Sequence, residues 1–129
     1  MNRKEQRDWV FKLIFENQIS EISDIKESFK LHELDLDEDS FVYKSLEALI
    51  NNKEKIEDLL LKQIGDSQFK RLSKVDKSIL YLSLNEMFNL DIPVSVSINE
   101  AVNLSKDYSN KDSYKFVNSV LGNITRKEK

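Results

Sequence analysis

Two short segments near the ends of the chain combine side chains that suit contacts with nucleic acid. The first holds Arg3, Lys4 and Arg7, which are three or four residues apart and can therefore share one face of a helix. Guanidinium and ammonium groups clustered in this way suit phosphate contacts, and arginine planes also stack on unpaired bases. The alternative interpretation is an ordinary solvated face, because Glu5 and Asp8 dilute the positive charge.

The second segment runs from Lys111 to Asn118 and interleaves basic, aromatic and amide side chains at the expected start of a helix. Recognition of single-stranded RNA commonly uses such a mixture, since each base stacked on an aromatic ring contributes about 1–3 kcal/mol. The competing interpretation is that Phe116 belongs to the core and that Asp112 or Ser113 only caps the helix. The pattern alone does not separate the two interpretations.

Elsewhere the sequence offers little that could support catalysis, a cofactor or a metal ion. The chain has no cysteine, no Gly-rich phosphate loop and no HExxH motif. The single histidine, His32, has no catalytic partner in the sequence and is expected to be a surface or partly packed residue. The acidic stretch Glu33–Ser40 lacks the glycine and the final glutamate of a calcium-binding loop at the required spacing. We therefore expect a protein that is not an enzyme and carries no cofactor.

Composition predicts an all-α protein that forms one compact domain over residues 1–129. The chain contains only two glycines and one proline, whereas sheet proteins of this size usually need many turns. Residues 1–12 carry a formal charge of +2 and residues 106–129 a charge of +3, so the middle of the chain is acidic. No apolar run approaches the roughly 20 residues that span a bilayer. A charged N-terminus without an apolar signal segment, and the lack of cysteine, predict a cytoplasmic protein.

Helical spacing of apolar residues predicts about seven helices. Pro93 separates two of them, and Ser95 or Ser97 is expected to cap the second. Gly65 is expected to end a long bent helix or a helical hairpin whose break falls within Asn51–Lys55. The expected segments are 3–17, about 23–32, 41–64 with its break, a short turn at 69–72, 75–88, a helix through 98–108, and a final helix from about 112.

Three blocks of the sequence resemble the NusB family of transcription antitermination factors. The first is Arg71–Glu86, which includes Leu72, Val75-Asp76, Ile79-Leu80 and Glu86. The second is Ile92-Pro93-Val94 followed by Ile98-Asn99-Glu100-Ala101-Val102 and Lys106, and the third is Asp112-Ser113 with Phe116-Val117-Asn118 and Val120-Leu121. The basic N-terminal pattern that ends at Arg7 is also similar to that of the family. The resemblance covers nearly the whole chain and is most specific in its C-terminal half.

The resemblance implies a seven-helix bundle that binds the boxA sequence of nascent RNA as a heterodimer with the ribosomal protein NusE. Such a complex joins RNA polymerase and suppresses termination, notably in ribosomal RNA operons. By resemblance, the RNA-contacting residues would be Arg3, Lys4, Arg7, Asp112, Lys115 and Phe116. The surface that faces NusE would involve the helix that carries Asp76 and Glu86. Some members of the family also form homodimers, and the sequence leaves that possibility open here.

Two other functions remain open at this stage. The basic run is interrupted by Glu5 and Gln6, which reduces the expected phosphate contacts and fits a helical protein-interaction module with weak RNA affinity. A NusB-like domain also forms the N-terminus of some RNA cytosine methyltransferases. That function would require the chain to be a fragment, because a catalytic cysteine and a cofactor domain are missing from it.

Overall fold

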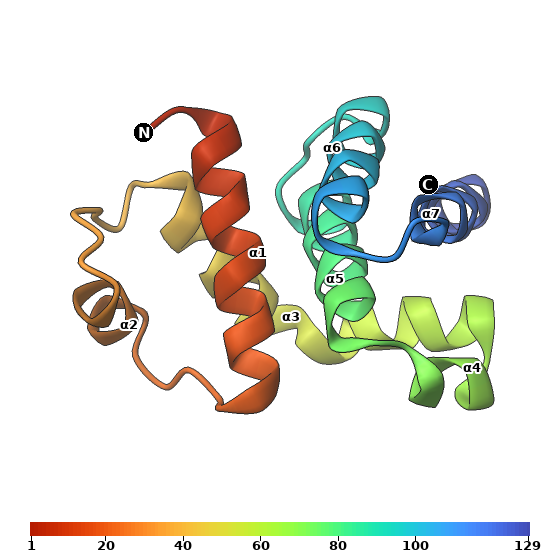
Figure 1. Cartoon of the computed structure of the whole chain (residues 1–129), viewed down its shortest axis with the longest axis horizontal. Coiled ribbons are helices and arrows are strands. Elements are labelled where there is room, and N and C mark those ends of the chain that lie inside the picture. Colours follow the sequence, from red (N-terminus) through yellow and green to blue (C-terminus); the bar gives the residue numbers. More distant parts are fainter.

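The computed structural model describes residues 1–129 and contains seven α-helices and no strand. The all-helical class and the number of helices are therefore as the sequence predicted (Figure 1). The helices are α1 (Arg3–Ile19), α2 (Ile25–Leu31), α3 (Phe41–Ile64), α4 (Asp66–Arg71), α5 (Lys74–Asn89), α6 (Val94–Tyr108) and α7 (Ser113–Glu128).

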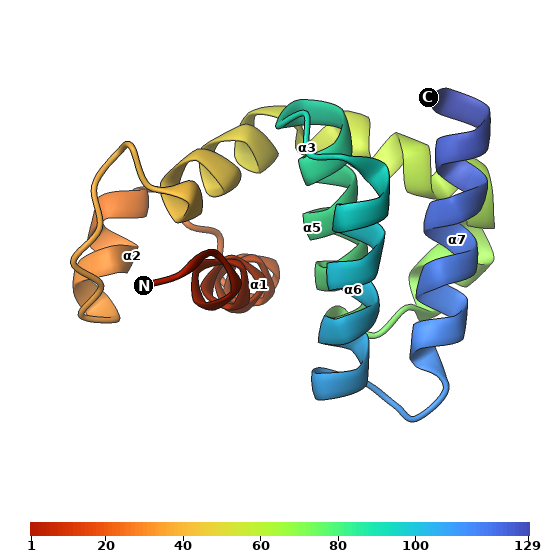
Figure 2. The same ribbon diagram turned by 90° about the horizontal axis from the view of Figure 1, so that it is seen from above.

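The helices form two groups that share the long helix α3. In Figures 1 and 2, α1 and α2 lie at one end of α3, while α5, α6 and α7 stand side by side at the other end. Helix α5 is the centre of the molecule and packs against α1, α3, α6 and α7. Every residue from Ser78 to Met87 is buried, so α5 is covered by other helices on all sides.

Side-chain caps explain where several helices begin. Asn2 and Glu5 form a capping box at α1, in which the Asn2 side chain accepts from the Glu5 amide and the Glu5 carboxylate accepts from the Asn2 amide. At α3 and α5 the cap is a single bond, in which the hydroxyl groups of Ser40 and Ser73 accept from the amides of Tyr43 and Asp76. Gly65 ends α3 with a φ of 83°, a conformation that glycine adopts without strain.

The expected cap of α6 is wrong. Helix α6 begins directly after Pro93 and has no side-chain cap. Ser97 is instead fully buried, and its hydroxyl group lies 2.9 Å from the hydroxyl group of Ser83 on α5. The serine that the sequence offered as a cap therefore joins two packed helices.

The predicted break in α3 is a bend within one continuous helix. Asn52 has non-helical backbone angles, and its side-chain amide donates to the Ala48 carbonyl at 2.7 Å. This bond satisfies a carbonyl group near the kink. The bend lets the first half of α3 pack on α1 while the second half reaches α7.

Candidate nucleic-acid interface

The first two predicted RNA-binding residues, Arg3 and Lys4, lie exposed on the first turn of α1. The Arg3 guanidinium stacks over the ring of Phe41, with its central carbon 4.1 Å from the ring centroid. Lys4 lines a groove between α1 and α6. The two cations therefore contact different neighbours of α1, although both remain open to solvent.

Arg7 does not share that exposed surface. Only 5% of its surface is accessible, and its Nε donates to a carboxylate oxygen of Glu86 at 2.7 Å. A second guanidinium nitrogen lies 3.9 Å from Glu100. Arg7 does lie on the same side of α1 as the other two cations, since it approaches the Phe41 ring with Arg3 and lines the groove with Lys4. The expectation that its guanidinium group is open to phosphate there is wrong, because the buried carboxylate of Glu86 holds it.

The pair formed by Arg7 and Glu86 ties α1 to the central helix α5. Burial raises the pKa of the Glu86 carboxyl group above its ordinary value, while the hydrogen bond and the positive charge of Arg7 act in the opposite direction. Glu86 is 1% exposed, so the expectation that it faces a protein partner is also wrong. Its function in this chain is to hold the first helix against the core.

The groove between α1 and α6 has a volume of about 360 Å³. Its walls carry Lys4 and part of Arg7 together with four carboxylate side chains, which are Glu5, Asp8, Glu100 and Asp107. Such a mixed lining attracts phosphate weakly, because the carboxylates offset the cations. Residues 100, 103, 104 and 107, which form its α6 wall, were not predicted, although their helical spacing places them on one face.

The predicted residues at the start of α7 are two exposed side chains and one half-buried ring. Lys115 and Asp112 are exposed and 3.7 Å apart. Phe116 is half-buried and packs against the hydrophobic core. The structure therefore supports the core interpretation of Phe116, but it leaves part of the ring accessible.

Hydrogen bonds fix the turn between α6 and α7 relative to α5. Asp76, in the first turn of α5, accepts from the Ser109 hydroxyl at 2.6 Å and from the Ser113 hydroxyl at 3.4 Å. Asp76 is half-buried and both of its carboxylate oxygens are engaged within the chain. It therefore positions the start of α7, which carries Asp112 and Lys115.

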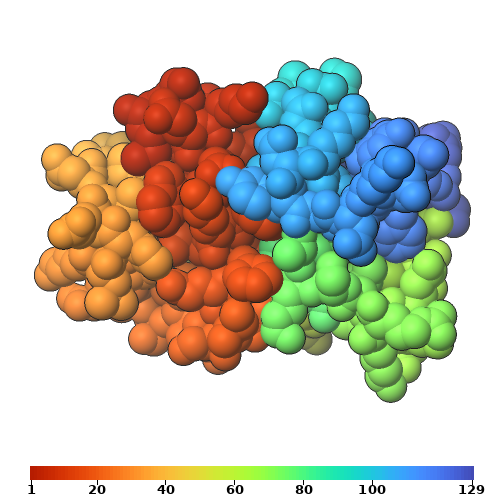
Figure 3. Space-filling view, in the orientation of Figure 1, coloured from red at the N-terminus to blue at the C-terminus, as the bar shows by residue number.

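The end of α6 is in turn held against α1. The Tyr108 hydroxyl donates to Asp8 at 2.6 Å, and the ring of Tyr108 stacks on Phe11 with centroids 4.8 Å apart. The hydrogen bond to Asp8, assisted by partial burial, raises the pKa of Tyr108 to about 12. In the space-filling view, α1 and the α6–α7 turn meet on one face (Figure 3). The fold thus brings the two predicted segments to neighbouring parts of one surface.

His32 lies away from this surface and is partly packed. Its Nε2 is 2.8 Å from a carboxylate oxygen of Glu16, and its ring lies 5.4 Å from that of Trp9. The expectation of a partly packed or surface histidine is confirmed.

No group of three or more His, Asp or Glu side chains is arranged to hold a metal ion. None of the seven helices is both long enough and apolar enough to cross a membrane.

Comparison with known proteins identifies the family. The NusB family model matches residues 4–126. The transcription antitermination protein NusB of Clostridium novyi is 39% identical over 98% of this chain and 99% of its own length. The protein of the same name from Bacillus licheniformis is also 39% identical, over 96% of both chains. These names describe a transcription factor and not an enzyme.

The fold agrees with that of a solved relative. The structure of T. maritima NusB superimposes with a TM-score of 0.80 at 31% identity, over 98% of this chain and 92% of that chain. The agreement extends through all seven helices because the match covers nearly the whole of both chains. The chain therefore belongs to the NusB family of transcription antitermination proteins.

Proposed function

We propose that this protein binds the boxA sequence of nascent RNA together with the ribosomal protein NusE and helps RNA polymerase to pass terminators, notably in ribosomal RNA operons. The observation that carries the proposal is the pair of exposed cationic segments on neighbouring parts of one face. These are the first turn of α1, with Arg3 and Lys4, and the start of α7, with Lys115. The Asp8–Tyr108 and Asp76–Ser109 hydrogen bonds hold them in place.

Such a surface suits an extended single strand better than a duplex. The two cationic segments lie on one face with the end of α6 between them, so an RNA that contacts both must be extended (Figure 3). Phe116 offers part of an aromatic ring at that edge. Few phosphate contacts are available without Arg7, so a second protein is needed to reach useful affinity.

The NusE-facing surface is proposed to include the first turn of α5 at Asp76 but not the buried Glu86. Asp76 would act there by holding the α6–α7 turn in the shape that the partner meets. A homodimer that used the same face would compete with RNA. Sedimentation of the free chain with and without RNA distinguishes a monomer from such a homodimer, since a competing dimer dissociates as RNA is added.

The test is a titration of a boxA oligonucleotide with the chain alone and with the chain bound to NusE. We expect tight binding only for the heterodimer. Replacing Lys115 by Glu should weaken that binding, whereas Lys55→Glu, an equal charge change at an exposed site of α3, should have little effect. Equal losses for the two variants would show that net charge and not this surface attracts the RNA.

A second candidate is a protein-interaction module with weak RNA affinity. The observation that favours it is the α1–α6 groove, whose four carboxylates make that part of the face unattractive to phosphate. In the same titration this function predicts that the heterodimer forms but that RNA adds no measurable stability to it.

A further inference from the structure

A second groove lies between α6 and α7 and has a different character from the α1–α6 groove. Its volume is about 550 Å³, which is within the usual range of about 300–1,000 Å³ for ligand sites. Two lysines and no carboxylate line it, so the local charge is positive in a protein whose net charge is −3. Its lining residues are Ser95, Ile98, Asn99, Val102, Lys106, Tyr114, Lys115 and Asn118.

The ammonium groups of both lysines lie over the ring of Tyr114. The ammonium nitrogen of Lys106 is 4.9 Å from the ring centroid, and that of Lys115 is 5.9 Å from it. Tyr114 is half-buried, which fixes the ring while leaving part of it accessible. When these exposed lysines swing from the ring to the phosphates of a bound strand, they uncover an aromatic face on which a base can stack.

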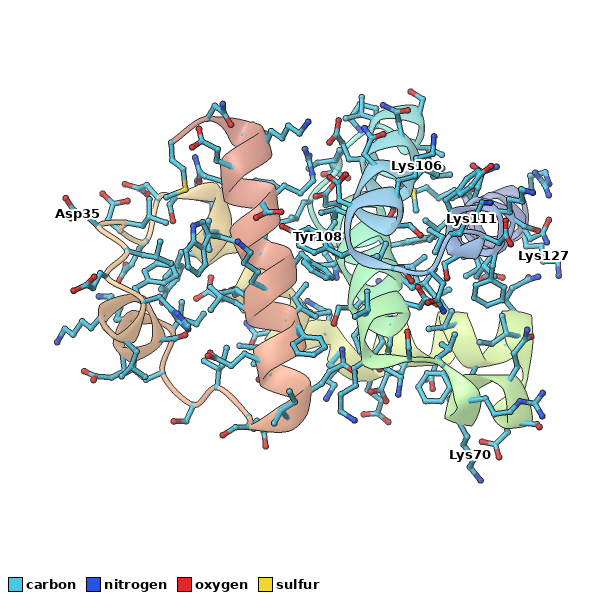
Figure 4. The ribbon with its side chains drawn as sticks, in the orientation of Figure 1. Asp35, Lys70, Lys106, Tyr108, Lys111 and Lys127 are labelled. Carbon is cyan, nitrogen blue, oxygen red and sulfur yellow. The ribbon has the colours of Figure 1, made fainter.

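Both lysines are available to bind an anion. Lys106 is exposed, forms no ion pair and contacts the Tyr114 ring. The exposed pair between Lys115 and Asp112, 3.7 Å apart, contributes little and opens readily. Figure 4 shows Lys106 on the side of α6 that faces α7, whereas Tyr108 points toward α1.

Exposed amides complete the groove on both walls. Asn118 is one turn beyond Tyr114 on α7, and Asn99 is two turns before Lys106 on α6. An amide group offers both a donor and an acceptor to a base edge, whereas a lysine offers donors alone. With these amides the groove is better suited to a base than to a bare phosphate.

We propose that the α6–α7 groove binds one nucleotide of single-stranded RNA, with the base stacked on Tyr114 and the flanking phosphates bound by Lys106 and Lys115. The inference rests on the proposed function, because it extends the RNA-binding surface beyond the start of α7 to the outer face of α6. Lys115 lies both at the start of α7 and in the groove, so it would join the two regions of the RNA-binding surface.

The test compares variants of the heterodimer with NusE in fluorescence anisotropy titrations with a boxA oligonucleotide. Tyr114→Leu keeps an apolar side chain at the half-buried position but removes the aromatic face. We expect it to weaken binding roughly five- to a hundredfold, while Tyr114→Phe should remain within about twofold of the wild type. Lys106→Glu should weaken binding and Lys55→Glu should not. Circular dichroism of each variant verifies that the helices are retained.

Each outcome decides the proposal. If the wild-type complex binds RNA and the groove variants match it, the groove inference is overturned while the proposed function stands. If the wild-type complex binds no RNA, both fall. If the groove variants lose affinity for an oligoglutamate peptide as much as for RNA, the groove is a docking site for acidic protein segments, and the nucleotide proposal is wrong.

Discussion

At the scale of single residues, Arg7 shows how a charge that looks solvent-facing in the sequence is used inside the protein. Its guanidinium group and the Glu86 carboxylate are both buried and are joined at 2.7 Å. The net contribution of such a pair to stability is small, because both charges lose their hydration. Removal of one partner is costly, since the other is left buried and unpaired.

Arg7→Ala is therefore expected to lower the free energy of unfolding by about 3–5 kcal/mol. Replacing both residues by apolar ones, as in Arg7→Met with Glu86→Leu, should recover most of the loss. Urea unfolding followed by circular dichroism measures both effects, and Arg3→Ala is the matched control at an exposed position of the same helix. An Arg7→Ala variant as stable as the Arg3→Ala variant would contradict the assignment.

The pH dependence of this variant follows from the raised pKa of Glu86. A carboxyl group whose pKa is higher in the folded state favours folding at low pH, and this contribution is lost as the pH rises through the folded-state pKa. Loss of Arg7 raises that pKa further. We expect the destabilisation by Arg7→Ala, measured relative to wild type, to be smaller at about pH 5 than at about pH 8. A pH-independent difference would show that packing and not charge makes Arg7 important.

At the scale of helices, the sequence predicted most boundaries because their signals are local. Gly65 ends α3 and Asn52 lies at its bend, as spacing and residue type indicated. Ser97 was misassigned because a serine after a proline is equally suited to a cap and to a buried interhelical hydrogen bond. Which of these forms depends on the neighbouring helix, and the local sequence does not contain that information.

The turn between α6 and α7 is an element whose position depends on one side chain of another helix. Asp76→Ala removes the acceptor for Ser109 and Ser113. We expect faster amide hydrogen exchange in residues 109–116 and weaker RNA binding by the heterodimer, although Asp76 would not touch the RNA. Thr125→Ala, which removes a local hydrogen bond at the far end of α7, should leave exchange in that turn unchanged. Unchanged exchange in the Asp76 variant would show that backbone packing alone holds the turn.

At the scale of the whole molecule, the fold follows from the sequence more fully than the binding surface does. Apolar periodicity and scarce glycine and proline predicted a helical bundle, because burial of apolar faces leaves few arrangements for seven helices. The charge of the binding surface depends on which side chains lie beside opposite charges once the chain is folded. Glu100 and Asp107 lie far from Lys4 in the sequence, yet they share its groove and offset its charge. Lys106 and Tyr114 come together only because α6 packs on α7.

Selective RNA binding by the heterodimer is tested by a competition between boxA and scrambled RNA of equal length. The dissociation constants of the NusE-bound chain for the two RNAs should be measured at physiological salt, because phosphate contacts alone cannot distinguish the sequences. We expect boxA to be bound at least about tenfold more tightly, which requires only one or two base-specific contacts. Equal affinity for the two RNAs would contradict this expectation and would leave a protein that joins NusE without reading boxA.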